Sequence, residues 1–200
     1  HLVRAYRETY GLNTTVTNCS NNYGPFQFPE KLIPLMIISI LNGRPLPVYG
    51  DGLQIRDWLH VSDHCAAITL ALTRGAAGEV YNIGGQREIT NLELVRLLCR
   101  LMDESAAATP TLFSAHTRAP PIRGGRSQEL ITHVADRPGH DRRYAVDFSK
   151  ARHELGYAPS FDLEGGLRST IQWYLVNAEW WQSLLGRDYA AWLRSNYSSR

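Results

Sequence analysis

The chain has 200 residues, of which 44% are hydrophobic and 20% charged, with a formal net charge of +2. This composition is typical of a globular protein, and the small basic excess excludes the dense lysine and arginine surface that nucleic-acid binding requires. The longest apolar run, residues 35–41, is much shorter than the ~20 residues needed to span a bilayer, so no membrane partner is expected.

The first residues show a helical pattern that starts abruptly. Val3, Tyr6 and Tyr10 recur at helical spacing and Gly11 follows them as a typical helix end, but no Ser, Thr, Asp or Asn precedes them as a cap. We therefore expect the first turns of this helix to lie upstream of His1, which means that the chain is truncated.

Regular elements then alternate along the chain. Strands are expected where β-branched and aromatic residues gather, and helices where apolar residues follow a capping residue or a proline. Ser62 or Asp63 is expected to cap the third helix, and Thr90 with Glu93 forms a capping box ahead of the fourth. In order, the pattern predicts a strand at 13–19, a loop at 20–25, a helix from about 29 to 41, an extended segment at 45–49, a strand at 55–60, a helix at 65–74, a strand at 79–84 and a helix from 90.

The composition changes between residues 103 and 130, where Ala, Ser, Thr, Pro, Gly and Arg dominate without periodicity. This change predicts a mobile insertion. Order resumes at Ile131, and helices are expected at 149–155 and 163–177. The helical spacing of the aromatic residues in the tail is typical of core packing; they are Trp180, Trp181, Tyr189, Trp192 and Tyr197.

The alternation of strands and helices predicts an α/β fold with a parallel sheet. No glycine-rich turn follows a first strand, as a complete dinucleotide-binding domain would require, so the sheet is expected to be an incomplete Rossmann-like sheet containing only C-terminal strands. A small α/β domain is expected to accompany it.

Three polar clusters lie at the ends of predicted strands, where open α/β sheets bind ligands. The amides of Asn21 and Asn22 can donate and accept from one loop, although asparagine in a loop also simply caps backbone groups. The second cluster joins Pro47, Val48 and Tyr49 to Arg56, whose guanidinium matches phosphate oxygens; its plainer interpretation is a surface arginine beside a core tyrosine.

The third cluster runs from Asp136 through Arg137, Pro138 and Gly139 to His140, and Arg142 and Arg143 follow it. A charge run is usually a solvated face, but the proline and glycine impose an unusual backbone path that also suits an anion site.

Two further features have structural interpretations. His60 and His64 are four residues apart but lack a third ligand at useful spacing, so no metal site is predicted. Cys19 has no evident general base beside it, so we interpret it as a small packed residue and not as a nucleophile. Cys19, Cys65 and Cys99 are odd in number and lack C-x-x-C spacing, and no signal-peptide pattern is visible, so we expect a reducing cytoplasm.

Five motifs together resemble the dTDP-glucose 4,6-dehydratases, which are extended short-chain dehydrogenases/reductases. The resemblance covers nearly the whole chain outside the insertion, and the last motif is the narrowest. The motifs are TNCSNNYGP at 17–25, FPEKLIP at 28–34, QIRDW at 54–58, YNIGG at 81–85 and ADRPGHDRRY at 135–144.

The resemblance implies a hydro-lyase that uses NAD to oxidise the C4 of dTDP-glucose, eliminate water across C5 and C6, and reduce C6. It implies that Asn22 contacts NAD, and that Arg137 contacts the diphosphate of the nucleotide sugar. The substrate-binding residues that it implies are Asn21, Lys31, Leu32, Pro47, Val48, Tyr49, Arg56, Asn91, Asp136, Arg137, Pro138, Gly139 and His140.

The resemblance also implies a domain organisation. Residues 1–28 would end the NAD-binding Rossmann domain, residues 29–56 would form a substrate-binding segment, and residues 57–85 would return to the sheet. Residues 86–200 would form the C-terminal substrate-binding domain, with the insertion at 103–130. The parent enzyme would be a homodimer.

The chain departs from the family in one large respect. The glycine-rich NAD loop, the Tyr-x-x-x-Lys pair and the Asp-Glu acid/base pair belong upstream of His1, so no catalytic residue is assigned and the 200 residues alone are expected to be inert. His60, where the family suggests tyrosine, is a lesser departure. A related nucleotide-sugar epimerase or decarboxylase, and a non-catalytic nucleotide-sugar-binding module, remain as alternatives.

Overall fold

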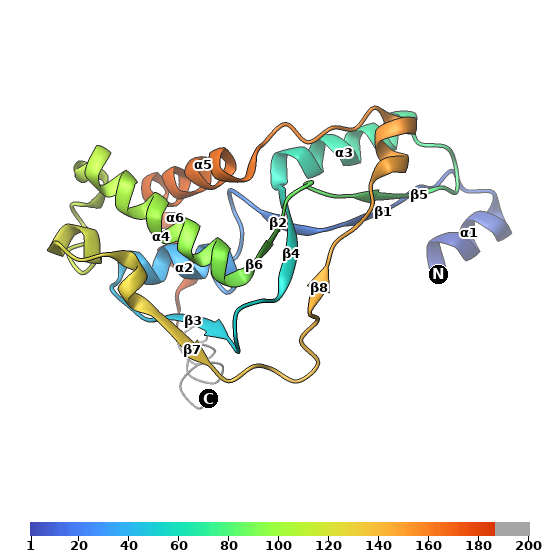
Figure 1. The fold of residues 1–200 in the computed structure, drawn as a ribbon. Coiled ribbons are helices and arrows are strands. Elements are labelled where there is room, and N and C mark those ends of the chain that lie inside the picture. Colours follow the sequence, from blue (N-terminus) through green and yellow to red (C-terminus); the bar gives the residue numbers. More distant parts are fainter. Residues whose placement is uncertain (187–200) are drawn as a thin grey trace. The chain divides into compact units, whose positions relative to one another are not determined.

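A computed structural model describes residues 1–186 and divides the chain into two compact units (Figure 1). Each unit is assembled from three separate segments of the chain. Within the described residues, the first unit comprises residues 1–23, 56–88 and 143–163, and the second comprises residues 24–55, 89–142 and 164–186.

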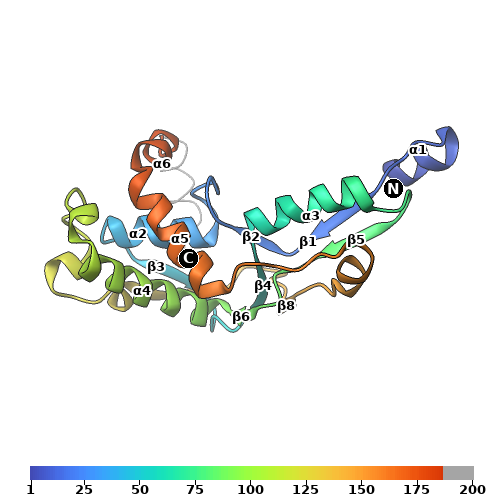
Figure 2. The same ribbon diagram turned by 90° about the horizontal axis from the view of Figure 1, so that it is seen from above.

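The first unit is built on parallel strand pairs. β1 pairs with β5, with Val16 opposite Val80, and β2 pairs with β4, with Asn21 opposite Trp58. Helix α3 runs along β1 and β5 (Figure 2). The elements are α1 (Leu2–Tyr10), β1 (Val16–Cys19), β2 (Asn21–Tyr23), β4 (Ile55–His60), α3 (Val61–Arg74), β5 (Val80–Ile83), β8 (Arg143–Tyr144) and a π-helical turn (Ala151–Leu155), and β6 (Glu88–Thr90) begins at the last residue of the middle segment.

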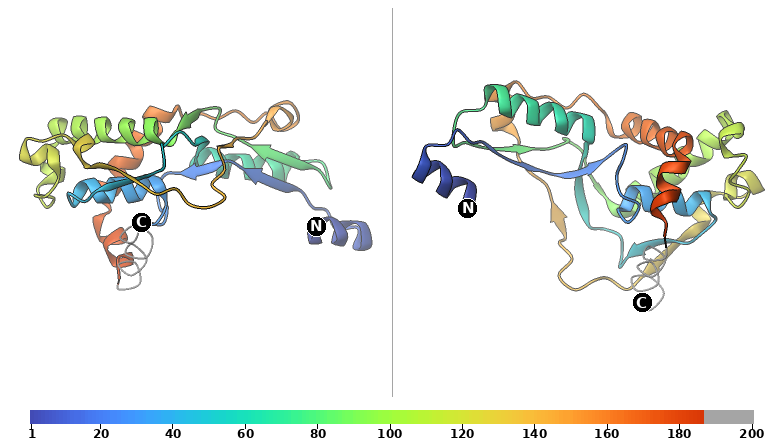
Figure 3. Two further views of the ribbon diagram at one scale, coloured as in Figure 1. Left: turned by 60° about the horizontal axis from the view of Figure 1, so that its bottom comes forward. Right: turned by 180° about the vertical axis from the view of Figure 1, so that it is seen from behind.

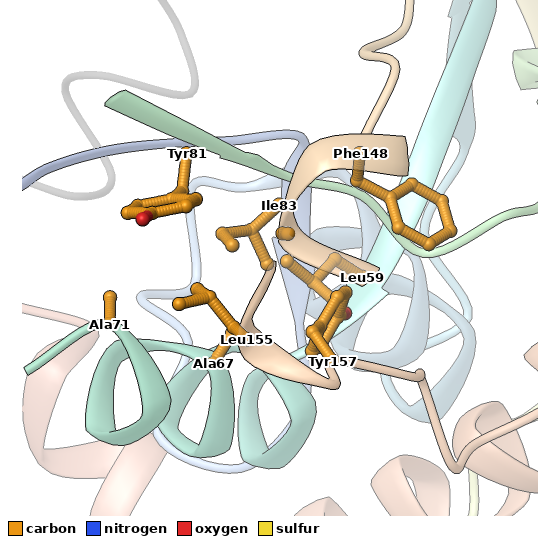
Figure 4. Close-up of a cluster of buried hydrophobic side chains, with 9 residues drawn as sticks. Leu59, Ala67, Ala71, Tyr81, Ile83, Phe148, Leu155 and Tyr157 are labelled. Atoms are coloured by element: carbon orange, nitrogen blue, oxygen red, sulfur yellow. The ribbon is translucent and has the colours of Figure 1, made fainter. Parts of the chain in front are cut away.

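The core of this unit lies between α3, β5 and the segment that follows β8. Nine buried side chains form it (Figure 4): Leu59, Ala67, Ala71, Tyr81, Ile83, Phe148, Ala151, Leu155 and Tyr157. The two buried phenols are satisfied, because the hydroxyl of Tyr81 donates to Glu154 at 3.0 Å and that of Tyr157 donates to the Gly84 carbonyl at 2.9 Å. Burial raises the pKa of Tyr157.

The start of α3 differs from the prediction. Its cap is His60, whose Nδ1 accepts from the Ser62 amide at 3.3 Å, so the assignment of the cap to Ser62 or Asp63 was wrong. The buried carboxylate of Asp63 is instead hydrogen-bonded to a distant segment. It accepts from the Ser160 amide at 3.1 Å, the Ser160 hydroxyl at 2.6 Å and the Phe161 amide at 3.1 Å. Local spacing alone could not show this competition.

The second unit combines a short parallel pair with helices. β3 and β7 run side by side (Figure 3), with Leu46 opposite Ile131 and Tyr49 opposite Val134. Both hydrogen bonds of the predicted capping box between Thr90 and Glu93 are present. The elements are α2 (Leu32–Leu41), β3 (Leu46–Tyr49), α4 (Asn91–Ala108), β7 (Ile131–Val134), α5 (Leu163–Val176) and α6 (Ala178–Leu184).

Helix α2 lies at the centre of the second unit. All of its residues from Ile33 to Leu41 are buried, so it lacks the polar stripe of a surface helix. It packs against α4 and β3. The apolar run in the sequence is therefore core helix.

Residues 103–130 contain more regular structure than the sequence predicted. Helix α4 continues to Ala108, and three 3-10 turns follow and pack against α4. Phe113 and Ala119 are fully buried, and Asp103 accepts from the Ser127 amide and hydroxyl at 3.2 and 2.5 Å. The turns span Pro110–Phe113, Pro120–Arg123 and Ser127–Leu130. A few buried apolar side chains and the carboxylate of Asp103 hold these turns against α4. The composition of the segment does not reveal these contacts.

The predicted α/β fold with parallel strands is confirmed. Two local differences remain: residues 21–23 form a strand where a loop was expected, because β4 pairs with them, and residues 143–163 belong to the first unit rather than to the C-terminal segment. Trp181 is buried, as core packing requires, whereas Tyr189, Trp192 and Tyr197 lie outside the described residues. Within residues 1–186, no helix has the length and apolar character needed to cross a membrane.

Replacing Asp63 should test the link between α3 and the segment at 160–161. Asp63→Ala leaves three donors without their acceptor, so we expect a loss of about 3 kcal/mol in the free energy of unfolding, measured with urea. Asp147→Ala is the matched control, because Asp147 accepts from the amide and hydroxyl of Ser149 but is exposed; it should lose at most about 0.5 kcal/mol. Equal losses would contradict the role of burial.

Candidate functional site

The carboxylate of Asp136 organises the loop that follows β7. Its Oδ1 accepts from the Arg137 amide at 2.8 Å and lies 2.7 Å from Nδ1 of His140, and its Oδ2 accepts from Nε2 of Gln54 at 2.8 Å. The hydrogen bond from His140 is the main cause that lowers the pKa of Asp136. Asp136 therefore stays ionised and joins two segments that are 82 positions apart.

The parallel pairing of β3 and β7 explains why these segments meet. The carboxyl ends of parallel strands lie at one edge, and there the Gly50 amide donates to the Val134 carbonyl at 2.9 Å. Gly50 has φ +56, and a Cβ at this position would lie 3.2 Å from both Cβ and Oδ2 of Asp136. Glycine favours this turn, because it readily adopts a left-handed conformation and leaves room for the carboxylate.

The turn between β3 and β4 brings Asn91 to the same edge. The Asn91 amide donates to the Gln54 carbonyl and the Leu92 amide to the Gly52 carbonyl, both at 2.9 Å. A Cβ at Gly52 would meet side-chain atoms of both Val48 and Leu92. The side-chain oxygens of Gln54 and Asn91 are buried and have no hydrogen-bond partner in residues 1–186.

Aromatic and charged groups complete this edge of the second unit. Tyr49 meets His140 edge-on, with ring centroids 6.0 Å apart, and the His140 side chain is only 5% exposed. Arg142 pairs with Asp51 at 3.0 Å on the surface. The structure thus brings together the predicted residues Pro47, Val48, Tyr49, Asn91 and 136–140.

Lys31 and Leu32 lie elsewhere in the second unit, at the start of α2. Lys31 is exposed and pairs with Glu30 at 2.9 Å, and Leu32 is the first residue of the helix. The tip of the loop after β7 is exposed and consists of Arg137, Pro138 and Gly139. Gly139 has φ +68.

The remaining predicted residues belong to the first unit. Nδ2 of Asn22 donates to the Ser20 carbonyl at 3.0 Å and to Sγ of Cys19 at 3.3 Å, and Oδ1 lies 2.8 Å from Nδ1 of His64. Burial lowers the pKa of His64, so this ring is neutral and donates to Asn22. Asn21 lies opposite Trp58, and Arg56 on β4 is 8% exposed.

His60 lies in an aromatic environment beside these residues. It stacks on Phe161 with ring centroids 3.8 Å apart and meets Tyr23 edge-on at 5.3 Å. Because Nδ1 accepts the Ser62 amide, the neutral ring carries its proton on Nε2, which is buried and has no partner within the described part of the chain. Burial is the main cause that lowers the pKa of His60. His60 and His64 thus both have structural hydrogen bonds.

The fold and the candidate site define an α/β protein whose polar residues gather at the carboxyl ends of parallel strands. The family model described as GDP-mannose 4,6 dehydratase matches residues 1–170, and the chain belongs to this family. The resemblance drawn from the five motifs is confirmed by the relatives described next.

Two curated relatives and one solved structure illustrate the similarity. The chain is 55% identical over 189 residues to a dTDP-glucose 4,6-dehydratase of Neisseria meningitidis serogroup B, covering 94% of this chain and 50% of the relative. It is 50% identical over 200 residues to that of Salmonella typhimurium, covering 100% and 51%. A dTDP-glucose 4,6-dehydratase structure from Streptomyces venezuelae, with NAD and dTDP bound, matches with TM-score 0.78 and 43% identity, over 92% and 50% of the two chains. The chain spans about half the length of these relatives.

The buried cap of α3 should make stability depend on pH. A histidine with a lowered folded-state pKa binds fewer protons when folded than when unfolded, so stability is complete above about pH 6.5 and falls as the pH decreases below that value. His64 and His116 contribute in the same direction, because burial lowers their pKa values too. His60→Asn keeps a capping acceptor without a titrating group and should reduce this slope.

Urea unfolding of both proteins at pH 7.5, 6.5 and 5.5 measures the slope. His153→Asn is the control, because His153 is exposed and its replacement should leave the slope unchanged. An unchanged slope in His60→Asn would show that His60 is not the buried neutral cap described here.

Proposed function

We propose that the full-length protein is an NAD-dependent dTDP-glucose 4,6-dehydratase that forms dTDP-4-keto-6-deoxyglucose and water. The observation that carries this proposal is the identity of 50–55% along almost the whole chain with proteins of that name. The loop at 136–140, which lies within the narrowest of the motifs and is held by Asp136, supports it. Bound NAD supplies the hydride acceptor for oxidation at C4 and the hydride for reduction at C6.

Nucleotide-sugar binding is proposed for the edge of the second unit around Asp136. Exposed Arg137 offers a guanidinium to the diphosphate, and the buried side-chain oxygen of Asn91 can accept from a ligand donor. Tyr49 offers an aromatic surface. The other contacts proposed in this unit are Pro47, Val48, Pro138, Gly139 and His140, with Lys31 and Leu32 at the start of α2. Asn21 and Arg56, which belong to the first unit, stay predictions from the family resemblance.

NAD binding is proposed at the carboxyl end of β1. The hydroxyl of Ser20 is buried there without a partner among the described residues, which fits a polar group of a ligand. Asn22 lies two residues further on, and its contact with the Cys19 sulfur is a weak one that a cofactor amide can replace. We therefore assign Asn22, with Ser20 beside it, to cofactor binding.

The acid/base machinery is proposed to lie outside these 200 residues. The sequence contains no Tyr-x-x-x-Lys pair, and its adjacent Asp103 and Glu104 have structural partners. Asp103 holds Ser127, and Glu104 pairs with Arg100 at 2.7 Å and with Arg168 at 2.6 Å. Residues 1–200 alone should therefore bind the nucleotide sugar without turning it over.

A cytoplasmic homodimer is proposed for the full-length protein. The three cysteines are free, which fits a reducing compartment. Helix α1 has no buried residue, and it exposes Leu2, Val3, Tyr6 and Tyr10. An apolar helix face of this kind fits a subunit interface.

An assay of the full-length protein tests the reaction. We expect dTDP-glucose with NAD to give a 4-keto sugar, and GDP-mannose, the substrate named by the family model, to react far more slowly. Conversion of a different nucleotide sugar, or epimerisation without loss of water, would overturn the proposal. Nucleotide-sugar binding without any turnover would instead favour a binding module.

Arg137→Ala tests the proposed diphosphate contact. The loss of a charge-assisted hydrogen bond should reduce kcat/KM for dTDP-glucose about ten- to hundredfold. Arg123→Ala is the matched control, because Arg123 is an exposed arginine on a 3-10 turn of the same unit; it should keep the parent value. Equal effects of the two substitutions would contradict a specific role of Arg137.

A further inference from the structure

We propose that Gln54 is a positioning residue of the nucleotide-sugar site: it holds Asp136 so that His140 carries its proton on Nδ1 and presents Nε2 to the ligand as a hydrogen-bond acceptor. The identity of the ligand rests on the proposed function, but the arrangement of the three side chains does not. Gln54 belongs to the QIRDW motif, yet its side chain is not among the residues that the sequence assigned to the site.

The orientation of the Gln54 amide is set by its partner. An ionised carboxylate can only accept hydrogen bonds, so the group 2.8 Å from Oδ2 of Asp136 must be the NH2 end of the amide. This leaves Oε1 buried without a partner among the described residues, in a side chain that is 3% exposed. An unpaired buried acceptor is destabilising, and an apolar residue of similar size would avoid this cost. A glutamine here therefore indicates that the bond to Asp136 matters.

Asp136 transmits this constraint to His140. Its Oδ1 lies 2.7 Å from Nδ1 of His140, and because a carboxylate only accepts, Nδ1 must carry a proton. In the neutral ring Nε2 is then an acceptor. Nε2 has no hydrogen-bond partner among residues 1–186.

The surroundings leave Asp136 and His140 little freedom. The Arg137 amide also donates to Oδ1, and Gly50 approaches the carboxylate so closely that a Cβ there would be 3.2 Å from it. The Tyr49 ring lies edge-on to His140, whose side chain is 5% exposed. Gln54 is the only side chain among the described donors that holds Oδ2, so its removal should let the carboxylate rotate and weaken the contact of Oδ1 with Nδ1 of His140.

The tautomer determines which ligand group His140 can contact. A neutral Nε2 accepts from a hydroxyl or an N–H and cannot donate to a phosphate oxygen. His140 should therefore contact a hydroxyl or N–H group of the nucleotide sugar, while the phosphates are left to arginine. A hydrogen-bonded partner that fixes the tautomer of a functional histidine typically affects affinity without touching the ligand.

The tautomer can be measured directly on the full-length protein without ligand. Long-range nitrogen–proton NMR at pH 7.5 distinguishes the two nitrogens of His140. We expect Nδ1–H in the parent protein and a mixture of tautomers in Gln54→Met, which matches glutamine in size but cannot donate. Gln54→Glu is a second, nearly isosteric variant that places a like charge beside Asp136, and it should give the same mixture.

Calorimetric titration with dTDP supplies the functional readout. Both variants should bind dTDP about tenfold more weakly than the parent, as expected for one misplaced hydrogen bond. Gln128→Met, at an exposed glutamine of the same unit, should change neither measurement.

The two proposals can fail separately. An Nε2–H tautomer in the parent protein, or an unchanged Nδ1–H tautomer in either folded variant, overturns the positioning role of Gln54. Failure of the parent protein to bind dTDP overturns the proposed nucleotide-sugar function instead, and the NMR result then still decides the role of Gln54.

Discussion

The structure depends on aspartates that each collect donors from a distant part of the chain. Asp136 joins the loop after β7 to Gln54, Asp63 joins α3 to residues 160–161, and Asp103 joins α4 to Ser127. Asp57 accepts from the amides of Gly85 and Arg87, both at 3.0 Å. A carboxylate can take several donors at once, and such charge-assisted bonds are stronger than neutral ones. Each aspartate thus connects two segments that hydrophobic packing alone would place only approximately.

Carboxylates that link distant segments occur both in the core of the fold and at the candidate site. At Asp63 the carboxylate only anchors chain segments, whereas at Asp136 it also holds a histidine at the end of two parallel strands. Strands β3 and β7 place the two backbone segments side by side, and Gly50 leaves space for the Asp136 carboxylate. The carboxylate in turn orients the His140 ring.

Local patterns in the sequence were sufficient to predict many of the helices and strands. The left-handed Gly11 that ends α1, the strand at 55–60 and the capping box of Thr90 all depend on neighbours within a few residues, and all were predicted. Asp63 is engaged by Ser160 instead of capping α3, and the turns within 103–130 are held through Asp103; both depend on partners far along the chain, which no local window includes. The same limit applies to the candidate site: its loop was singled out in the sequence, but the contact between Gln54 and Asp136 was not.

The division of each unit into three segments has a consequence for synthesis on the ribosome. The first unit needs residues 143–163, which emerge after most of the second unit has been made. Its strands β1 and β5 can pair early, but Phe148, Leu155 and Tyr157 reach its core only late. The nascent chain therefore exposes an apolar face of α3 and β5 for a long interval, and substitutions that slow or weaken this last step should lower the yield of soluble protein more than they lower its final stability.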